Sequence, residues 1–255
     1  MTEKPFNIVY TVDGSAEQLL MLRLSLITLL RFNAVDRIVV MYADTDELRL
    51  RATLSDIGHG IEYYPFDYGT VDQFFPHLPN VRNARLRYPS LMRWFLGRLP
   101  LDDFWYCDTD LLFAREVRSY LTSLQEDNII VTFNRKTYTD GYKKTRIGGY
   151  QHTSDPNAGL MYFNAKRWSQ AHFLSDIVEY YRVSAHRMQY VNQSALAWLM
   201  DCHRDVCRVV ISDEYNIKLW DYSRYEQIIP RIAVHHFNGE DKRLMWRVYN
   251  DIMSV

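Results

Sequence analysis

Apolar runs alternate with amphipathic stretches along the first quarter of the chain. Three runs rich in Val, Ile and Tyr predict β-strands at Asn7–Val12, Arg37–Tyr42 and Ile61–Tyr64. The segments between them, Ala16–Arg31 and Thr45–Leu54, carry apolar residues at the spacing of an α-helix. This alternation predicts an α/β fold with a mainly parallel central sheet flanked by helices. Ligands of such sheets bind beyond the carboxyl ends of the strands.

The rest of the chain continues this alternation, interrupted by one long polar segment. Further strands are predicted at Phe104–Cys107, Asn128–Phe133, Gly159–Phe163, Arg208–Ile211 and Ile232–His235. Further helices are predicted at Ser90–Leu99, Trp168–Val183 and Arg187–Met200. The segment Asn134–Pro156 is rich in Tyr, Lys and Gly and is interpreted as a long loop, which often binds or covers a ligand. Because no repeat or linker is evident, one domain is the simplest interpretation.

The composition is that of an ordinary globular protein and indicates no highly charged partner. The net charge is −1, so no strong field attracts nucleic acid or an anionic membrane. The three cysteines, Cys107, Cys202 and Cys207, form no CxxC pair, which argues against a disulfide framework or a zinc site. No secretory signal, membrane span or terminal amphipathic helix is evident, and we expect a cytoplasmic location. Peripheral membrane contact and the oligomeric state stay open.

Two copies of the tripeptide Asp-Thr-Asp follow predicted strands, at 44–46 and 108–110. Two carboxylates separated by one residue can face a divalent cation, and Mg²⁺ or Mn²⁺ accepts such oxygen ligands. In enzymes that use nucleotide sugars, this cation bridges the diphosphate and offsets the charge on the departing nucleotide. A lone Asp-x-Asp is weak evidence, because about one is expected by chance in a chain of this length.

The residues after each copy favour different roles. The first copy leads into a predicted helix, where Asp44 or Thr45 can be the N-cap and Asp46 and Glu47 suit the first turn. The second copy leads into Leu111–Phe113, which keeps the character of a strand. Its carboxylates have no capping role and are costly beside an apolar sheet unless a charge neutralises them. The second copy is therefore the candidate metal motif.

Several further segments occur in the order of a known family, across nearly the whole chain. They are Asn7–Gly14 (NIVYTVDG), Leu99–Phe113 (LPLDDFWYCDTDLLF), Asn157–Met161 followed by Asn164, Asn192–Leu196 (NQSAL), and Tyr215–Asn216 followed by His236–Lys242 (HFNGEDK). With these segments the chain resembles GT-A-fold glycosyltransferases, most closely the family-eight group that includes bacterial lipopolysaccharide galactosyltransferases and glycogenin. The resemblance implies one GT-A domain over 1–255, with a nucleotide-binding half at about 1–113 and an acceptor and sugar half at about 114–255.

The resemblance also implies a metal site made of three residues. Asp108, Asp110 and His236 would ligate the cation, and an imidazole ligand suits Mn²⁺ better than Mg²⁺. The neighbouring His235 can be the ligand instead, but only His236 fits the H-x-x-G-x-x-K spacing. The donor implied by the family is a UDP-sugar.

Other family positions imply contacts with the donor. The expected donor-binding residues are Thr11, Asp13, Arg93, Asp108, Thr109, Gly239 and Lys242. In the resembling family, the residues matching Thr11 and Asp13 contact the base and ribose, and the residue matching Lys242 binds the diphosphate. Asp13 can equally be a turn residue before glycine, and Arg85 and Arg87 compete with Arg93.

Around the transferred sugar, the resemblance places Asn157, Asn192 and Gln193 as the catalytic residues. In the family, the Gln lies on the face of the anomeric carbon and the reaction retains configuration. Amides position a sugar through hydrogen bonds but cannot act as general bases. Where the family has Asp on both sides of this Gln, the chain has Asn192 and Ser194. The departure leaves the donor sugar open and weakens any double-displacement mechanism.

The acceptor and two rival functions stay open. A glycan or glycolipid acceptor follows from the family alone, and the long loop offers Tyr138 and Tyr142 for stacking and Lys143 and Lys144 for phosphate. A nucleic-acid acceptor is therefore not excluded. One rival is a metal-dependent phosphatase with an Asp-x-Asp motif, which normally lies early in its chain. The other is a sugar-nucleotide-binding relative without turnover.

Overall fold

The structure of the chain is a computed structural model. The structure describes residues 4–76, 84–125, 127–134, 146–147, 150–151, 156–184, 191–218, 229–237 and 242–254, with the backbone alone at a few of these. Within these ranges, no helix has the length and apolar character needed to cross a bilayer.

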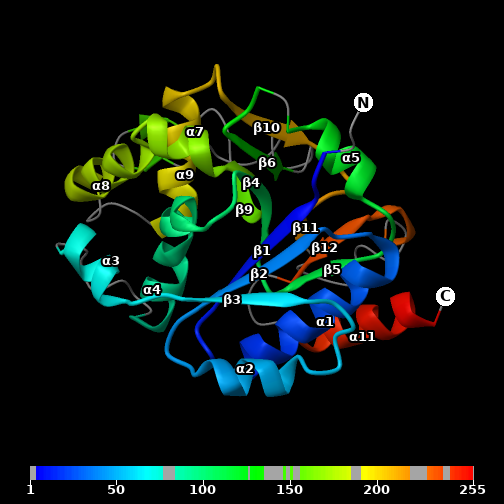
Figure 1. Cartoon of the computed structure of the whole chain (residues 1–255). Helices are drawn as coiled ribbons and strands as arrows, with labels where there is room; N and C mark the ends of the chain where they lie inside the picture. Colours follow the sequence, from blue (N-terminus) through cyan, green and yellow to red (C-terminus); the bar gives the residue numbers. More distant parts are fainter. Residues whose placement is uncertain are drawn as a thin grey trace.

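A seven-stranded sheet forms the centre of the molecule (Figure 1). In spatial order its strands are β10 (Cys207–Ile211), β6 (Ile130–Asn134), β9 (Asn157–Asn164), β4 (Asp103–Cys107), β1 (Asn7–Val12), β2 (Arg37–Tyr42) and β3 (Ile61–Pro65). Strand β9 runs antiparallel to both neighbours, and every other adjacent pair is parallel. The predicted α/β fold with a mainly parallel sheet is confirmed.

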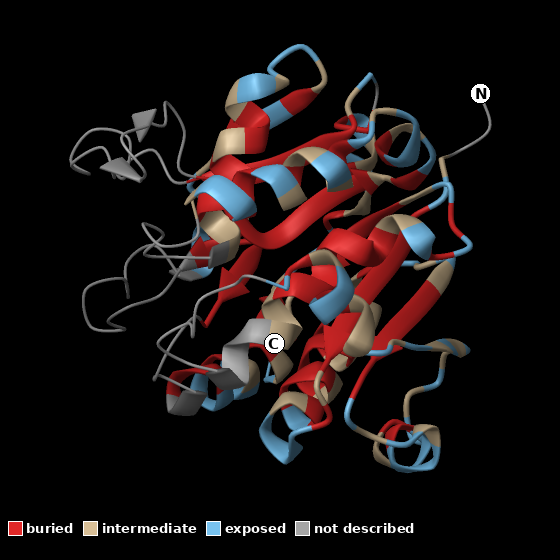
Figure 2. Ribbon diagram, turned by 90° about the vertical axis from the view of Figure 1, so that its left-hand side faces the viewer, coloured by how far each residue is buried: buried red, intermediate tan, exposed pale blue. Residues whose placement is uncertain are grey.

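Helices cover both faces of this sheet because successive side chains of each strand point to opposite sides. One face packs against α3 (Gly69–Phe74), α4 (Ala84–Met92), η1 (Arg93–Arg98), α7 (Ala165–Gln170), α8 (Phe173–Ser184) and α9 (Val191–Cys202). The other packs against α1 (Ala16–Phe32), α2 (Glu47–Thr53) and α5 (Arg118–Ser123). Figure 2 shows the central strands buried along their length and exposed residues on the outer surfaces of the helices. The two apolar layers fix the register of the sheet and hence the place where its strands end.

A smaller sheet contains β5 (Leu111–Phe113), the segment that follows β4. Its strands, in spatial order, are β11 (Ile217–Lys218), β12 (Val234–His236) and β5, and β12 runs antiparallel to β5. A short pair, β7 (Arg146–Ile147) and β8 (Tyr150–Gln151), lies within the segment predicted as a long loop.

The last described helix corrects the expectation that no terminal amphipathic helix exists. Helix α11 (Lys242–Met253) buries Leu244, Met245 and Val248 in a cluster with residues of α1, β5 and β11. Its opposite side exposes Trp246. The burial of the apolar side explains why this helix lies beside α1 (Figure 1).

Three predicted helices have different bounds. The first Asp-Thr-Asp copy does cap a helix, but the N-cap is Asp46, whose carboxylate accepts from the Arg49 backbone N–H, and not Asp44 or Thr45. The predicted helix Trp168–Val183 is two helices, separated at His172, which has a φ of 57°. The predicted helix Ser90–Leu99 begins earlier, at Ala84, and ends as the tighter η1.

Candidate functional site

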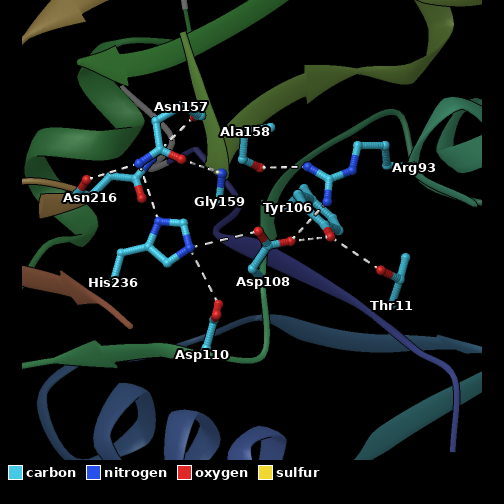
Figure 3. A network of polar contacts seen from close by, with 10 residues as sticks. All are labelled: Thr11, Arg93, Tyr106, Asp108, Asp110, Asn157, Ala158, Gly159, Asn216 and His236. Carbon is cyan, nitrogen blue, oxygen red and sulfur yellow. Dashed lines mark hydrogen bonds and ion pairs between the residues drawn. The ribbon is translucent and has the colours of Figure 1, made fainter. Parts of the chain in front are cut away.

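Asp108 and Asp110 lie where β4 ends at the carboxyl edge of the sheet. The Asp108 backbone N–H donates to the carbonyl of Gly159 at 2.7 Å, which continues the pairing of β4 with β9. Three residues after Asp108 the chain enters β5, at Leu111. The turn between the two strands places both carboxylates on the same side of the sheet edge (Figure 3).

Strand β12 brings His236 to this turn. His236 pairs with Leu111 in the small sheet, and the Phe237 backbone N–H donates to the carbonyl of Asp110 at 3.0 Å. Alternation along β12 sends the neighbouring side chain, His235, to the opposite face. His235 is buried there and its ring stacks on that of Phe237. The choice of His236 over His235 as the residue of the site is therefore supported by the strand geometry.

Three ligand atoms meet in the cluster of Asp108, Asp110 and His236, which we call the triad. Nε2 of His236 lies 3.4 Å from Oδ1 of Asp110 and 3.9 Å from Oδ2 of Asp108. One ligand atom from each residue lies within 4.8 Å of the other two. Ligand atoms that share an ion at about 2.1 Å lie roughly 3 Å apart when adjacent and roughly 4.2 Å apart when opposite. Two carboxylates and one imidazole at these separations fit a divalent cation.

A glycine makes room for the imidazole. A Cβ added to Gly159 would lie 2.4 Å from Cε1 of His236 and 2.7 Å from Nδ1. The backbone of β9 therefore touches one face of the ring, which only glycine permits. This contact explains the Gly of the Asn-Ala-Gly segment.

Asn157 contacts the imidazole at Nδ1 and is itself held by Asn216. Asn157 and Asn216 exchange hydrogen bonds, each side-chain amide donating to the backbone carbonyl of the other, at 3.2 and 3.1 Å. The Asn157 amide nitrogen also lies 3.2 Å from Nδ1 of His236, and its oxygen accepts from the Gly159 backbone N–H. Asn157 therefore contacts the imidazole of His236. Its contact with the transferred sugar stays a prediction.

Arg93 and Tyr106 contact Asp108 from the side away from His236. Arg93 donates to Oδ1 of Asp108 and to the carbonyl of Ala158, both at 3.2 Å, and its guanidinium lies over the Tyr106 ring. Tyr106 donates its hydroxyl hydrogen to the same Oδ1, and Thr11 lies 3.1 Å from the Tyr106 hydroxyl (Figure 3). Burial, and then the Asp108 carboxylate, raise the pKa of the Tyr106 phenol well above its usual value, against the lowering effect of Arg93.

Three of the residues predicted to bind the donor, Arg93, Thr11 and Thr109, lie in or next to this hydrogen-bond network. Arg93 lies beside the triad, whereas nothing is described of the side chains of its competitors Arg85 and Arg87. Thr11 is 8% exposed and bonded to Tyr106. Thr109, between the two carboxylates, is buried at 7% exposure.

A cavity of about 560 Å³ opens beyond the ends of β1 and β2. It is lined by Asp13, Gly14, Ser15, Asp44, Tyr68, Tyr88 and Pro89. The rings of Tyr68 and Tyr88 stack at a centroid distance of 4.7 Å. The Tyr68 hydroxyl is buried and has no hydrogen-bond partner among the described residues. Burial, followed by the charges of Asp13 and Asp44, raises the pKa of the Tyr68 phenol.

Asn192 and Gln193, the other two residues predicted around the sugar, lie at the start of α9. Asn192 accepts from the Tyr181 hydroxyl at 3.4 Å, and Tyr181 accepts from the indole of Trp94, the neighbour of Arg93. Gln193 is half-buried, whereas Ser194 is buried at 1% exposure with no hydrogen-bond partner for its hydroxyl among the described residues. The structure thus links Asn192 to the Arg93 side of the site.

Some predicted residues cannot be placed. Gly239 lies outside the described residues, as do Tyr138, Tyr142, Lys143 and Lys144 of the predicted loop. Lys242 begins α11, but its side chain is not described.

The sequence interpretation missed four residues of this region. Tyr106 carried a usable signal, because it lies two residues before Asp108 on a strand and so faces the same side. Asn216 was noted only as part of a motif, and its φ of 57° suits asparagine. Tyr68 and Tyr88 carried no such signal in the sequence, because the spacing of apolar residues between β3 and β4 does not predict that their rings stack.

Comparisons with known proteins give a family and a set of similar folds. The profile of glycosyl transferase family 8 matches residues 22–246. No curated protein matches the sequence. Among solved structures, the galactosyltransferase LgtC, in complex with donor and acceptor sugar analogues, superposes with a TM-score of 0.73 at 18% identity, over 98% of this chain and 95% of that chain.

Two further structures share the fold at lower identity. Mouse xyloside xylosyltransferase 1 gives a TM-score of 0.63 at 13% identity, over 92% of this chain and 98% of its own. The glycosyltransferase GlyE of Streptococcus pneumoniae gives 0.63 at 14% identity, over 98% of this chain and 62% of its own. These matches confirm the expected GT-A fold.

Proposed function

Since the chain belongs to glycosyl transferase family 8, we propose that it transfers a hexose from a UDP-sugar to a glycan or glycolipid, with a divalent cation and with retention of configuration. The observation that carries the proposal is the triad, which follows β4 at the carboxyl edge of the sheet, the same edge at which the cavity lies beyond the ends of β1 and β2. Open α/β sheets bind nucleotides at this edge.

Asp108, Asp110 and His236 are the residues that would hold the cation, with Mn²⁺ favoured over Mg²⁺ because of the imidazole ligand. When bound, the cation supplies positive charge that offsets the negative charge of the diphosphate. Asp108 turns one oxygen toward His236, while Arg93 and Tyr106 hold the other. The protein therefore presents a fixed set of ligand atoms and spends little free energy on ordering them.

The cavity lined by Asp13 is the proposed site of the nucleoside. Carboxylates of Asp13 and Asp44 accept hydrogen bonds from ribose hydroxyls or from the N–H group of uracil. The unpartnered Tyr68 hydroxyl adds a donor or acceptor on the same wall. A ligand that satisfies this buried hydroxyl removes a cost that the empty cavity carries.

The transfer step needs an acceptor oxygen on the same face of the sugar as the departing diphosphate. The bond from the anomeric carbon to the phosphate oxygen breaks, the acceptor oxygen bonds to that carbon, and the acceptor proton passes to a phosphate oxygen of the released UDP. Asn192 and Gln193 carry no carboxylate, so a covalent glycosyl intermediate has no nucleophile there. Their amides, with Asn157, would position the sugar by hydrogen bonds.

The two Asp-Thr-Asp copies provide a matched test. UDP released from a panel of UDP-hexoses is measured with Mn²⁺ and with a chelator for the wild type, Asp110→Asn and Asp46→Asn. We expect release that needs Mn²⁺, is lost by at least about 100-fold in Asp110→Asn, and is kept in Asp46→Asn, because asparagine also caps a helix. Release from no sugar nucleotide, or equal release by both variants, would refute the proposal. The anomeric configuration of the product, read by NMR, tests retention.

A further inference from the structure

The hydrogen bonds between Thr11, Tyr106 and Asp108 have only one possible direction. A carboxylate accepts, so the single hydroxyl hydrogen of Tyr106 is donated to Oδ1 of Asp108. That leaves only a lone pair on the Tyr106 oxygen for Thr11, which therefore donates its own hydrogen over the 3.1 Å between them. The chain of donors runs from β1 to the end of β4.

These hydrogen bonds determine which oxygen of Asp108 faces His236. Oδ1 accepts from both Tyr106 and Arg93, whereas Oδ2 lies 3.9 Å from Nε2 of His236. Tyr106 is 1% exposed, and the side chain of Asp108 is 24% exposed. A buried phenol that is fixed by its packing thus holds a partly exposed carboxylate in one rotamer.

We propose that Tyr106 is a positioning residue that orients Asp108 toward the cation, with Thr11 fixing the direction of the Tyr106 hydroxyl. The inference rests on the proposed function, because it concerns the affinity of the triad for the cation. Groups that hydrogen-bond to metal ligands typically contribute 10- to 100-fold to metal affinity. Tyr106 makes no contact with the cation itself in this account.

The position of Thr11 has a second consequence. Its hydrogen is committed to Tyr106, so its oxygen can only accept from a bound ligand. Thr11 lies near the end of β1, and Asp13, the first residue after that strand, lines the nucleoside cavity. A ligand group that reaches Thr11 must therefore be a donor, such as a ribose hydroxyl, and its binding reinforces the same direction of hydrogen bonds.

Tyr162 offers a matched control for the loss of a buried phenol. Like Tyr106, Tyr162 is 1% exposed, and it donates to a carboxylate, that of Asp103, at 3.3 Å. It lies on the neighbouring strand β9 and on the other face of the sheet. Tyr162→Phe and Tyr106→Phe each remove one hydroxyl and leave the ring in place.

The experiment titrates Mn²⁺ against full-length protein with excess UDP and records the thermal midpoint, with unbound Mn²⁺ followed by its EPR signal. We expect Tyr106→Phe to raise the Mn²⁺ concentration at half-saturation by at least about 10-fold. Thr11→Val, which leaves the bond from Tyr106 to Asp108 intact, should raise it by less than Tyr106→Phe does. Tyr162→Phe should lower the midpoint of the ligand-free protein without changing the Mn²⁺ concentration at half-saturation.

Equal Mn²⁺ affinity in the wild type and Tyr106→Phe would overturn the inference and leave the proposed function standing. An equal weakening in Tyr106→Phe and Tyr162→Phe would overturn it as well, because the effect would then reflect stability alone. A wild type that binds no Mn²⁺ in the presence of UDP would overturn both the proposed function and this inference.

Discussion

Gly159 and His236 show how closely the site depends on single atoms. The ring of His236 is 3% exposed and lies against the backbone of β9, with Asn157 at its Nδ1. Its Nε2 faces the two carboxylates. The imidazole can occupy this position only because residue 159 has no side chain.

Gly159→Ala tests this dependence. The new Cβ would lie 2.4 Å from Cε1 of His236, so the ring must move away from the carboxylates. We expect the Mn²⁺-dependent binding of UDP to fall by at least about 10-fold, measured by isothermal titration calorimetry. Gly58→Ala is the control, since a Cβ at that position has no described atom within 4 Å. Unchanged affinity in Gly159→Ala would show that His236 is not a ligand.

Strand β12 gives two adjacent histidines different environments. His236 faces the carboxylates of Asp108 and Asp110, whereas His235 is 1% exposed and its ring stacks on that of Phe237. Burial lowers the pKa of His235 to about 3. Burial in β12 therefore keeps the His235 imidazole uncharged in the folded protein. This makes the free energy of unfolding depend on pH.

The direction in which His235 changes the free energy of unfolding depends on whether the folded or the unfolded protein binds the proton. An unfolded His235 takes up a proton below pH ~6.5, while the folded one stays neutral down to about pH 3. Its contribution to stability is thus complete above pH ~6.5 and is lost as the pH falls below that value, at about 1.4 kcal/mol per unit. Between pH 7.5 and 5.5, the free energy of unfolding of the wild type should fall by about 1.4 kcal/mol more than that of His235→Phe. Urea denaturation of both proteins at both pH values measures this difference. An equal fall in the free energy of unfolding in the wild type and His235→Phe would contradict the lowered pKa of His235.

Helix α11 packs against α1 and against Phe237, the residue that follows β12, and the two sides of the helix should respond differently to truncation. Met245 is 1% exposed and packs in the cluster that contains Phe237, whereas Trp246 is 42% exposed and contacts Tyr249. Met245→Ala should cost about 2–4 kcal/mol of the free energy of unfolding. Trp246→Ala should cost less than about 1 kcal/mol. Chemical denaturation compares the two, and a larger loss in Trp246→Ala would show that the described side of the helix is not the packed one.

At the scale of the whole molecule, the sheet and the triad could be predicted, because apolar runs and motif order carry that information. Strands β1 and β2 have the predicted bounds, and His236 meets Asp108 as the family pattern implied. The break at His172 could not be predicted, since a single residue at positive φ interrupts a continuous helical pattern. The cap at Asp46 depended on the backbone turn at Asp44, which also has positive φ, and no apolar period reports such a turn.

The cavity and the hydrogen-bond network lay beyond sequence reasoning for a related reason. Tyr68 and Tyr88 meet only through the path of the chain between β3 and β4. Helix α11 buries Leu244, Met245, Val248 and Ile252, whose helical spacing could have predicted an amphipathic helix, whereas its contact with α1 could not be predicted. Such contacts depend on tertiary packing, which overrides local preference.

Thermal unfolding with UDP and Mn²⁺, separately and together, tests the central claim most directly. The claim is that Asp108, Asp110 and His236 hold a cation that in turn holds a nucleoside diphosphate. At about 100 times the dissociation constant, the pair of ligands should add about 2.7 kcal/mol, or about 5–10 °C for a chain of this size. The account predicts a shift that needs both ligands and disappears in Asp110→Asn. A UDP-induced shift that survives a chelator, or no shift with any nucleoside diphosphate, would contradict it.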